Sequence, residues 1–288
     1  MSPRLLCFGF GYTAGVLAER LSDQGWRIAG TTRFIDAGGG TEVSGAALYP
    51  FSRELGAEAL LGPLGEASHL LVSIPPDEEG DPVLDLLGEA ISSHQGLAWI
   101  GYLSTTGVYG DHGGAWVDEE APLHPASPRS RRRVAAEKAW LALCLDAGLP
   151  VHIFRLAGIY GPGRNALEAV RSGKAKRIDL PDQVFGRIHV EDIARTLEAS
   201  MKTPRPGRIY NVSDDHPAAP ADVIEFACGL LGLAPPPLQS MDDAELSPMA
   251  RSFYLDNKRV SNRRLHEELG LELRYPDYRA GLTALARA

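Results

Sequence analysis

Short apolar runs alternate with longer segments of helical periodicity over most of the chain. Glycine, proline or polar residues bound these runs, which is typical of strands buried on both faces of a parallel sheet. The predicted strands are 5–8, 26–31, 46–49, 69–74, 97–103, 151–155, 176–180, 185–188 and 208–212. The predicted helices are 15–25, 53–61, 83–93, 128–147, 190–201, 221–231 and 257–269. This order predicts an α/β protein with a doubly wound parallel sheet, the Rossmann fold.

The alternation loosens beyond Asn165, where the predicted elements become shorter. We therefore expect a Rossmann domain over 1–164, to which 190–213 contributes a further helix and strand. The segments 165–189 and 214–288 are expected to form a smaller, discontinuous C-terminal lobe that binds the substrate.

A glycine-rich turn follows the first predicted strand. Its pattern is G-x-G-x-x-A, formed by Gly9, Gly11 and Ala14, with a further glycine at Gly15. The first glycine permits a tight turn, and the second lets the backbone approach a pyrophosphate. A small third residue lets the next helix pack closely, with its N–H groups aimed at the anion. The residues expected to bind a dinucleotide here are Gly9, Phe10, Gly11, Tyr12, Thr13 and Gly15.

The end of the second strand indicates which dinucleotide binds. An acidic residue about 20 positions beyond the glycines would bind the ribose 2′-hydroxyl of NAD. Thr31 and Arg33 offer a hydroxyl and a guanidinium instead, which favours the 2′-phosphate of NADP, with NAD as the alternative. The competing interpretation is that Arg33 is a solvated loop residue. Ser73, Ile74 and Pro75 end the fourth strand at the same sheet edge and are also expected to touch the dinucleotide.

Composition narrows the class of protein. The 288 residues are 44% hydrophobic, which is ample for the core of one large or two small domains. The net charge of −8 argues against nucleic acid as a partner, because binding phosphate backbones requires a basic surface. No run is apolar enough to span a membrane, and cleavage of the first residues as a signal peptide would remove the glycine turn. The three cysteines are far apart and lack metal-ligand spacing, so we expect no metal site and a location in the reducing cytoplasm. The expected partner is a small-molecule substrate.

Four further stretches follow the glycine turn in a fixed order: Leu103–Gly110, Arg155–Arg164, Arg187–Asp192 and Tyr210–Val212. Together they resemble the NAD(P)-dependent epimerase/dehydratase branch of the extended short-chain dehydrogenase/reductase superfamily over essentially the whole chain. The resemblance implies that Thr105 is the catalytic hydroxyl that hydrogen-bonds the substrate oxygen. It also implies a homodimer formed through helices 83–93 and 128–147. Ser104, beside Thr105 at the end of the strand, is expected to contact the cofactor.

The acid–base pair of this family, Y-x-x-x-K, is replaced in this chain. Arg129 stands where the tyrosine is expected, and Arg133 stands where the lysine is expected. A guanidinium cannot act as an acid or base near neutrality, but it can hold ribose, phosphate or a developing alkoxide. The chain therefore resembles the atypical members, and we assign Arg133 to the cofactor and Arg129 to the substrate. Tyr109, His124 and a bound water are the candidate proton donors.

Thr106 and Gly107 occupy the places of the Asp-Glu pair that the dehydratases use, so sugar dehydration is not expected. Arg164, Arg187 and His189 would flank the same cleft and indicate an anionic or nucleotide-linked substrate, although His189 could equally be structural. We expect an NADP-binding oxidoreductase or epimerase-like enzyme that exchanges a hydride at a carbonyl or hydroxyl carbon. Because both members of the acid–base pair are replaced, the alternative is a non-catalytic NAD(P)-binding redox sensor or partner-binding protein.

Overall fold

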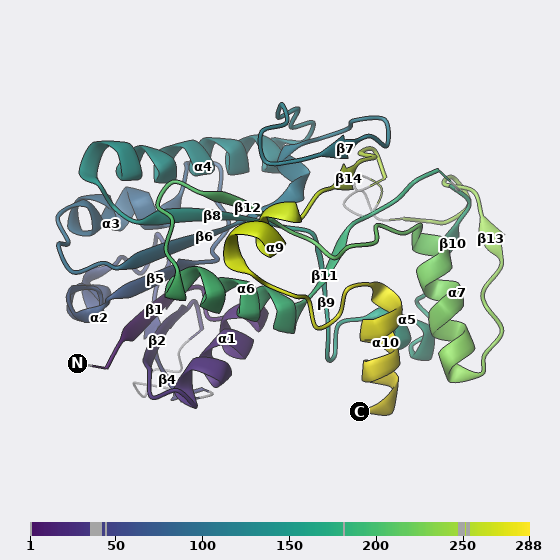
Figure 1. Ribbon diagram of the computed structural model, residues 1–288, viewed down its shortest axis with the longest axis horizontal. Coiled ribbons are helices and arrows are strands. Elements are labelled where there is room, and N and C mark those ends of the chain that lie inside the picture. The colour runs from purple at the N-terminus through teal and green to yellow at the C-terminus, as the bar shows by residue number, and fades with distance from the viewer. Residues whose placement is uncertain (1, 35–41, 44, 181, 247–250, 252–253) are drawn as a thin grey trace. The chain divides into compact units, whose positions relative to one another are not determined.

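The computed structural model describes residues 2–34, 42–43, 45–180, 182–246, 251 and 254–288 (Figure 1). Their contacts divide the chain into two compact units. Unit 1 comprises Met1–Thr105, Pro128–Arg155 and Ala194–Tyr210, and unit 2 comprises Thr106–Ser127, Leu156–Ile193 and Asn211–Ala288. Residues 106–127, 156–164, 190–193 and 211–213, which the sequence placed with the Rossmann domain, group with unit 2. One reason is that β7 (Trp116–Val117) pairs with β14 (Arg259–Val260) near the C-terminus.

An eight-stranded sheet forms the centre of unit 1, in the order β12-β8-β6-β5-β1-β2-β4-β3. Its strands are β1 (Arg4–Phe8), β2 (Arg27–Thr32), β3 (Glu42–Val43), β4 (Ala46–Pro50), β5 (His69–Val72), β6 (Trp99–Thr105), β8 (Val151–Leu156) and β12 (Ile209–Val212). β1 pairs in parallel with both β2 and β5, whereas the short β3 runs antiparallel to β4. Because the chain builds outward from β1 in both directions, the predicted doubly wound Rossmann fold is confirmed.

Helices cover both faces of this sheet (Figure 1). They are α1 (Tyr12–Ser22), α2 (Leu61–Glu66), α3 (Pro82–Ser92), α4 (Pro128–Ala147) and α6 (Val190–Lys202). α1 begins at Tyr12, three residues before the predicted Gly15, because Gly11 already acts as its N-cap. The predicted helix 53–61 is wrong. Gly56 has a φ of +72° in a turn closed onto Ser52, and only a 3₁₀ turn, Glu58–Leu60, precedes α2.

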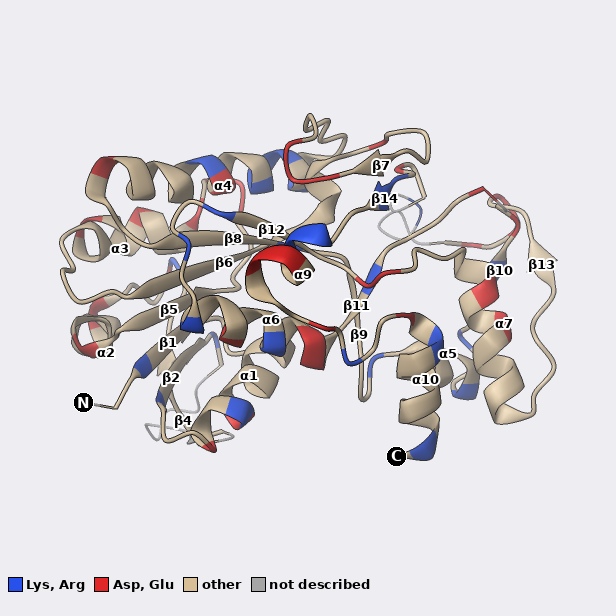
Figure 2. Ribbon diagram, in the orientation of Figure 1, with Lys and Arg blue, Asp and Glu red and all other residues tan. Residues whose placement is uncertain are grey.

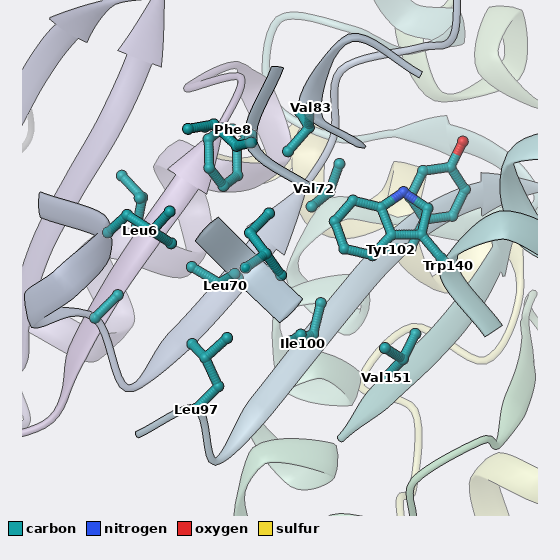
Figure 3. Packing of buried hydrophobic residues seen from close by; sticks show 14 of the residues in the cluster. Leu6, Phe8, Leu70, Val72, Val83, Leu97, Ile100, Tyr102, Trp140 and Val151 are labelled. Carbon is teal, nitrogen blue, oxygen red and sulfur yellow. The ribbon is translucent and has the colours of Figure 1, made fainter. Parts of the chain in front are cut away.

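The main core lies between the sheet and the helices α3 and α4 (Figure 3). Alternate strand residues point into it, as the period of two requires: Leu6 and Phe8 from β1, Leu70 and Val72 from β5, and Ile100 and Tyr102 from β6. Trp140 of α4 stacks on the ring of Tyr102 with centroids 6.0 Å apart. This packing fixes α4 against the middle of β6.

Unit 2 is built from short elements. Its strands are β7, β9 (Gly158–Tyr160), β10 (Arg177–Ile178), β11 (Arg187–His189), β13 (Leu238–Gln239) and β14, and its helices are α5 (Ala166–Arg171), α7 (Pro220–Leu231), α9 (Arg263–Leu269) and α10 (Tyr278–Arg287). Leu167, Val223 and Leu282 belong to a small core shared by α5, α7 and α10. The predicted helix 257–269 is correct only from Arg263 onward, because the residues before it form β14.

Helix α10 was missed, although its sequence carries a signal. The Asp277 side chain accepts a hydrogen bond from the N–H of Ala280 and caps the helix. Tyr278, Leu282 and Leu285 follow at helical spacing. None of the helices in the described ranges is long and apolar enough to cross a membrane.

Candidate active site

The glycine turn after β1 is held from three strands. Gly9 has a φ of +90°, which favours glycine, and its N–H donates to Thr31 Oγ1 of β2 over 2.8 Å. The Ser73 hydroxyl, just past β5, donates to the Gly9 carbonyl over 2.7 Å. A Cβ at Gly9 would lie 2.6 Å from that hydroxyl oxygen. The turn therefore has one tightly fixed shape that excludes a side chain.

The turn leads directly into the N-terminus of α1. Within the described residues, no side chain caps this end, and no acidic residue stands in the first turn. The first N–H groups of a helix lack intrahelical acceptors, so this end attracts an anion. Ala14 is buried against the sheet, whereas a Cβ at Gly15 would meet nothing within 4 Å. The small third residue of the motif is thus Ala14, and the cradle fits a dinucleotide pyrophosphate.

Thr31 and Arg33 serve different parts of this region. Thr31 is 2% exposed, and its hydroxyl already accepts the N–H of Gly9. Beside it, the Phe10 ring lies so close to Gly30 that a Cβ there would come within 2.5 Å of the ring. Arg33 is exposed just beyond β2, with its guanidinium 5.5 Å from the ring centre of Phe34. Thr31 therefore supports the turn, whereas Arg33 presents a positive charge to solvent.

The loop after β5 is clamped by an arginine that the sequence did not single out. Ser73 and Ile74 are half-buried and Pro75 is exposed. Beyond them, Arg53 Nε donates to Asp77 Oδ2 over 2.6 Å, and Arg53 Nη2 also contacts Asp85. The hydrogen bond from Arg53 lowers the pKa of Asp77 to about 2. Residues so far apart in sequence give no local signal of such a clamp.

A buried ion pair lies behind the end of β6. Glu137 of α4 and Arg155 of β8 are both buried, with Arg155 Nη2 and Glu137 Oε2 2.8 Å apart. The Ser104 hydroxyl donates to the same carboxylate. Because successive strand residues face opposite sides, Thr105 points away from this network, and it is half-buried at the last position of β6. The Ser104 hydroxyl is thus used by a buried carboxylate, whereas Thr105 lies half-buried at the end of the strand.

Arg133 is a buried cation at the same strand end. Basic residues gather in the first half of α4 (Figure 2), and Arg133 is the one that turns inward, with 7% of its surface exposed. Its Nη1 donates to the Leu103 carbonyl over 2.7 Å and to the Tyr102 hydroxyl over 3.0 Å. Among the described residues, no carboxylate lies within 4 Å of its guanidinium. Arg129, one helical turn earlier, is exposed.

Tyr109 is not placed for proton transfer. It has 0% of its surface exposed, and its hydroxyl donates to Asn211 Oδ1 over 2.7 Å. The assignment of Tyr109 as catalytic therefore finds no support, because a fully buried phenol cannot reach a substrate; it joins the loop after β6 to β12. His124 is exposed, and its ring stacks on that of His112 with centroids 5.0 Å apart.

The three substrate residues predicted in unit 2 differ in environment. Arg164 is exposed in the turn after β9, and Arg187 is half-buried on β11. His189 is buried between the rings of Tyr160 and Tyr275, and its Nδ1 accepts the Glu191 N–H over 3.2 Å. Burial lowers the pKa of His189. This geometry fits a structural role for His189. Arg164 and Arg187 remain as the charged candidates for binding the substrate.

The described part of the chain holds no group of three or more His, Cys, Asp or Glu residues that could bind a metal ion.

Comparisons with known proteins agree with this geometry. Residues 83–213 match the model of the NAD dependent epimerase/dehydratase family. Protein YeeZ of Escherichia coli (strain K12) is 30% identical over 282 residues, which cover 93% of this chain and 95% of that protein. A solved structure of a functionally unknown conserved protein from Silicibacter pomeroyi DSS is 52% identical, with a TM-score of 0.89 over 99% of both chains.

A more distant neighbour shares the fold. UDP-glucuronic acid 4-epimerase from Bacillus cereus, solved with UDP-glucuronic acid and NAD, is 18% identical, with a TM-score of 0.78 over 99% of this chain and 98% of that one. The glycine cradle, the order of the strands and the full-length relative together settle the family. The chain belongs to the NAD-dependent epimerase/dehydratase family and has the extended short-chain dehydrogenase/reductase fold.

Proposed function

We propose that the protein is an NAD(P)-dependent oxidoreductase or epimerase that exchanges a hydride at a carbonyl or hydroxyl carbon of a nucleotide-linked, anionic substrate. The observation that carries this proposal is the locked turn at Gly9 leading into the uncapped N-terminus of α1. A turn held from three strands, with no room for a side chain, lets the backbone approach a pyrophosphate closely.

The cofactor is held by unit 1. The backbone from Gly9 to Thr13 binds the pyrophosphate, and Arg33 binds the 2′-phosphate, so NADP is preferred over NAD. Ile74 and Pro75 border the same strand ends. The bound dinucleotide supplies a hydride acceptor or donor, and the chain's own residues orient the substrate and stabilise charge.

Thr105 and Arg133 have different roles at the end of β6. Thr105 hydrogen-bonds the reacting oxygen and fixes its position. Arg133 is fixed by the two hydrogen bonds that its Nη1 donates. It binds the ribose and stabilises the negative charge that develops on the reacting oxygen of the substrate. A guanidinium keeps its proton near neutrality, so water supplies the proton in place of the missing tyrosine. The hydride step should accordingly show no tyrosine-like ionisation in its pH profile.

The substrate class follows from charge. Arg187 and Arg164 in unit 2 offer two cations for phosphate. The relative from Bacillus cereus binds UDP-glucuronic acid and NAD, which supports a nucleoside diphosphate sugar as the substrate of this chain. A homodimer through α3 and α4 and a cytoplasmic location also stay predictions. Sedimentation of the purified protein tests the dimer.

Calorimetric titration tests the cofactor site. We expect NADPH to bind more tightly than NADH, and Arg33→Ala to remove most of that preference while leaving NADH binding unchanged. Arg129→Ala, an exposed arginine on another element, is the matched control and should bind NADPH like the wild type. Failure of both dinucleotides to bind would contradict the proposal.

Binding without turnover is the second candidate function, favoured by arginines at both positions of the acid–base pair. A panel of UDP-sugars and simple carbonyl compounds with bound NADPH separates the two. Turnover that Thr105→Ala abolishes, with NADPH affinity unchanged, supports the enzyme. Tight NADPH binding with no turnover of any compound supports the sensor.

A further inference from the structure

The central sheet of unit 1 carries a cavity at the edge opposite the glycine turn. The cavity has a volume of about 280 Å³ and lies between α2 and the first residues of β1 and β2, near the N-terminus (Figure 1). Arg4 and Arg27 begin these two strands, whereas Gly9 follows the other end of β1. Each strand residue advances the chain by about 3.3 Å, so the length of β1 separates the cavity from the dinucleotide cradle. The cavity is therefore not part of the proposed active site.

A short helix leaves this part of the sheet uncovered. α2 has six residues, and two of them are glycines. Leu64 packs into the main core, whereas a Cβ at Gly62 would meet no heavy atom within 4 Å. Ala29 of β2, Tyr49 of β4 and Pro63 of α2 line the cavity, and all three are half-buried. A methyl group, an aromatic ring and a pyrrolidine ring give the cavity apolar walls that suit a compact apolar group.

Two arginines border the same cavity. Arg4 and Arg27 are paired directly in the register of the parallel strands β1 and β2, so their side chains leave the same face of the sheet. Arg4 Nη1 forms an ion pair with Glu66 of α2. Among the described residues that line the cavity, Glu66 is the one acidic group. The cavity is therefore left with one positive charge, that of Arg27.

The polar groups of Arg27 and Tyr49 are available to a ligand. Arg27 is exposed, and its backbone N–H donates to the Pro3 carbonyl over 3.1 Å, but its guanidinium has no partner among the described residues. The Tyr49 hydroxyl likewise has no hydrogen-bond partner in the part of the chain that the structure describes. A free guanidinium can bind a carboxylate through two parallel hydrogen bonds. This combination of a free cation and apolar walls points to a ligand with both an anionic and an apolar part.

We propose that this cavity is a binding site for a small monocarboxylate with an apolar body, such as an arylacetate. The carboxylate pairs with Arg27, and the apolar body packs on Ala29 and Pro63 beside the ring of Tyr49. One uncompensated charge matches one carboxylate. The volume is just below the range of about 300–1,000 Å³ that is usual for drug-sized ligands, so the ligand is smaller than a dinucleotide. The site is additional to the proposed function and does not depend on it.

Phenylacetate is the probe, and two related compounds separate its two parts. Phenylacetamide keeps the ring without the charge, and acetate keeps the charge without the ring. Dissociation constants are measured by ligand-observed NMR at constant ionic strength. We expect phenylacetate to bind about tenfold or more tightly than either compound, because the charged hydrogen bonds and the buried ring both contribute. Acetate or phenylacetamide binding as tightly as phenylacetate would overturn the proposed ligand class.

Removal of the free charge tests the role of Arg27. Arg27→Gln should weaken phenylacetate binding about tenfold or more, because it removes a charged hydrogen-bond donor. Lys138→Gln is the matched control, since Lys138 is an exposed cation of α4 without a partner among the described residues. It changes the net charge by the same amount and should leave the affinity unchanged. Equal affinities of the two variants would contradict a site at Arg27.

A second variant fills the cavity and keeps its charges. Ala29→Ile adds bulk at the apolar wall, and a β-branched residue suits a strand, so the variant is expected to fold. Its melting temperature checks the fold. We expect no measurable phenylacetate binding although Arg27 is intact. A folded Ala29→Ile protein that binds phenylacetate like the wild type overturns the site, and Arg27→Gln still decides the matter if this variant does not fold.

Saturating NADPH distinguishes this cavity from the dinucleotide cradle. The affinity for phenylacetate should be the same with and without NADPH, because the two ligands lie at opposite ends of β1. Displacement of phenylacetate by NADPH would place the carboxylate in the cofactor site and overturn the proposal. Phenylacetate can bind to a protein that fails to bind NADPH, and the reverse also holds. The failure of this proposal is therefore distinguishable from the failure of the proposed function.

Discussion

Two buried arginines near the end of β6 make a useful comparison. Arg155 is matched by Glu137, and the carboxylate also accepts from Ser104, so the charge is balanced inside the protein. Arg133 donates to a carbonyl and a phenol, and among the described residues no carboxylate lies within 4 Å of its guanidinium, although the charge of the buried Asp81 acts on it from farther away. A buried arginine that contacts a carboxylate can be explained by its structural role alone. A buried arginine without such a contact is best explained by a ligand that supplies the opposite charge. The difference separates structural arginines from candidate site arginines in a chain that carries many.

The largest effect should come from breaking the balanced pair. Glu137→Gln leaves Arg155 buried without its counter-ion and should lower the free energy of unfolding by about 3–5 kcal/mol. Denaturant unfolding at pH 7 measures it. Replacing both residues by leucine should recover most of the loss. If Glu137→Gln costs less than about 1 kcal/mol, this pair is not the buried structural element described here.

A buried titratable group can also find its hydrogen-bond partners while it is neutral, and His152 is an example. Its Nε2 accepts the N–H of Arg205 over 2.8 Å, its other ring nitrogen lies 3.3 Å from the Ile100 carbonyl, and burial lowers its pKa to about 4. The unfolded value is about 6.5, so this stability is fully present above pH 6.5 and is lost as the pH falls toward 4. The loss should reach about 3 kcal/mol, and a folded His152→Gln variant should show a shallower decline of stability with acid. Identical slopes for the two proteins would argue against a buried neutral imidazole.

The glycine turn gives a smaller effect on stability with a matched control. Gly9→Ala places a Cβ 2.6 Å from the Ser73 hydroxyl at a φ of +90°, and should cost about 1–3 kcal/mol and abolish NADPH binding. Gly15→Ala meets nothing within 4 Å in the first turns of α1. It should stabilise the protein by about 0.5–1 kcal/mol with unchanged affinity. Equal behaviour of the two variants in urea unfolding and NADPH titration would refute the tight cradle.

Sequence reasoning succeeded where the signal is local. The apolar runs gave the strands of the sheet, and the spacing of Gly9, Gly11 and Ala14 gave the cradle, because both depend on neighbouring residues. It failed at 53–61, where Arg53 is drawn into contacts with Asp77 and Asp85 that no periodicity reveals.

Burial was the second source of error. Hydroxyls at the ends of strands were expected to face the cofactor. Instead, the Thr31 hydroxyl accepts the N–H of Gly9 in the glycine turn, and the Ser104 hydroxyl donates to the buried carboxylate of Glu137. Tyr109 belongs to a recognisable motif, yet its hydroxyl is used by Asn211. Which face a side chain takes depends on the partners that the fold brings to it, and one sequence does not show them. The hydrogen-bond partners of Arg133 and the charged partner of Arg155 were hidden for the same reason.

The central claim is that Arg133 awaits a ligand, and one titration tests it most directly. NADPH and 2′,5′-ADP, which lacks the nicotinamide ribose, are titrated calorimetrically into wild type, Arg133→Met and the exposed control Arg129→Met. The account predicts that Arg133→Met keeps its affinity for 2′,5′-ADP and loses about tenfold or more for NADPH, since a charged hydrogen bond contributes about 1.5–3 kcal/mol. Arg129→Met should match the wild type for both. An Arg133→Met protein that folds and binds NADPH as tightly as the wild type would contradict the account.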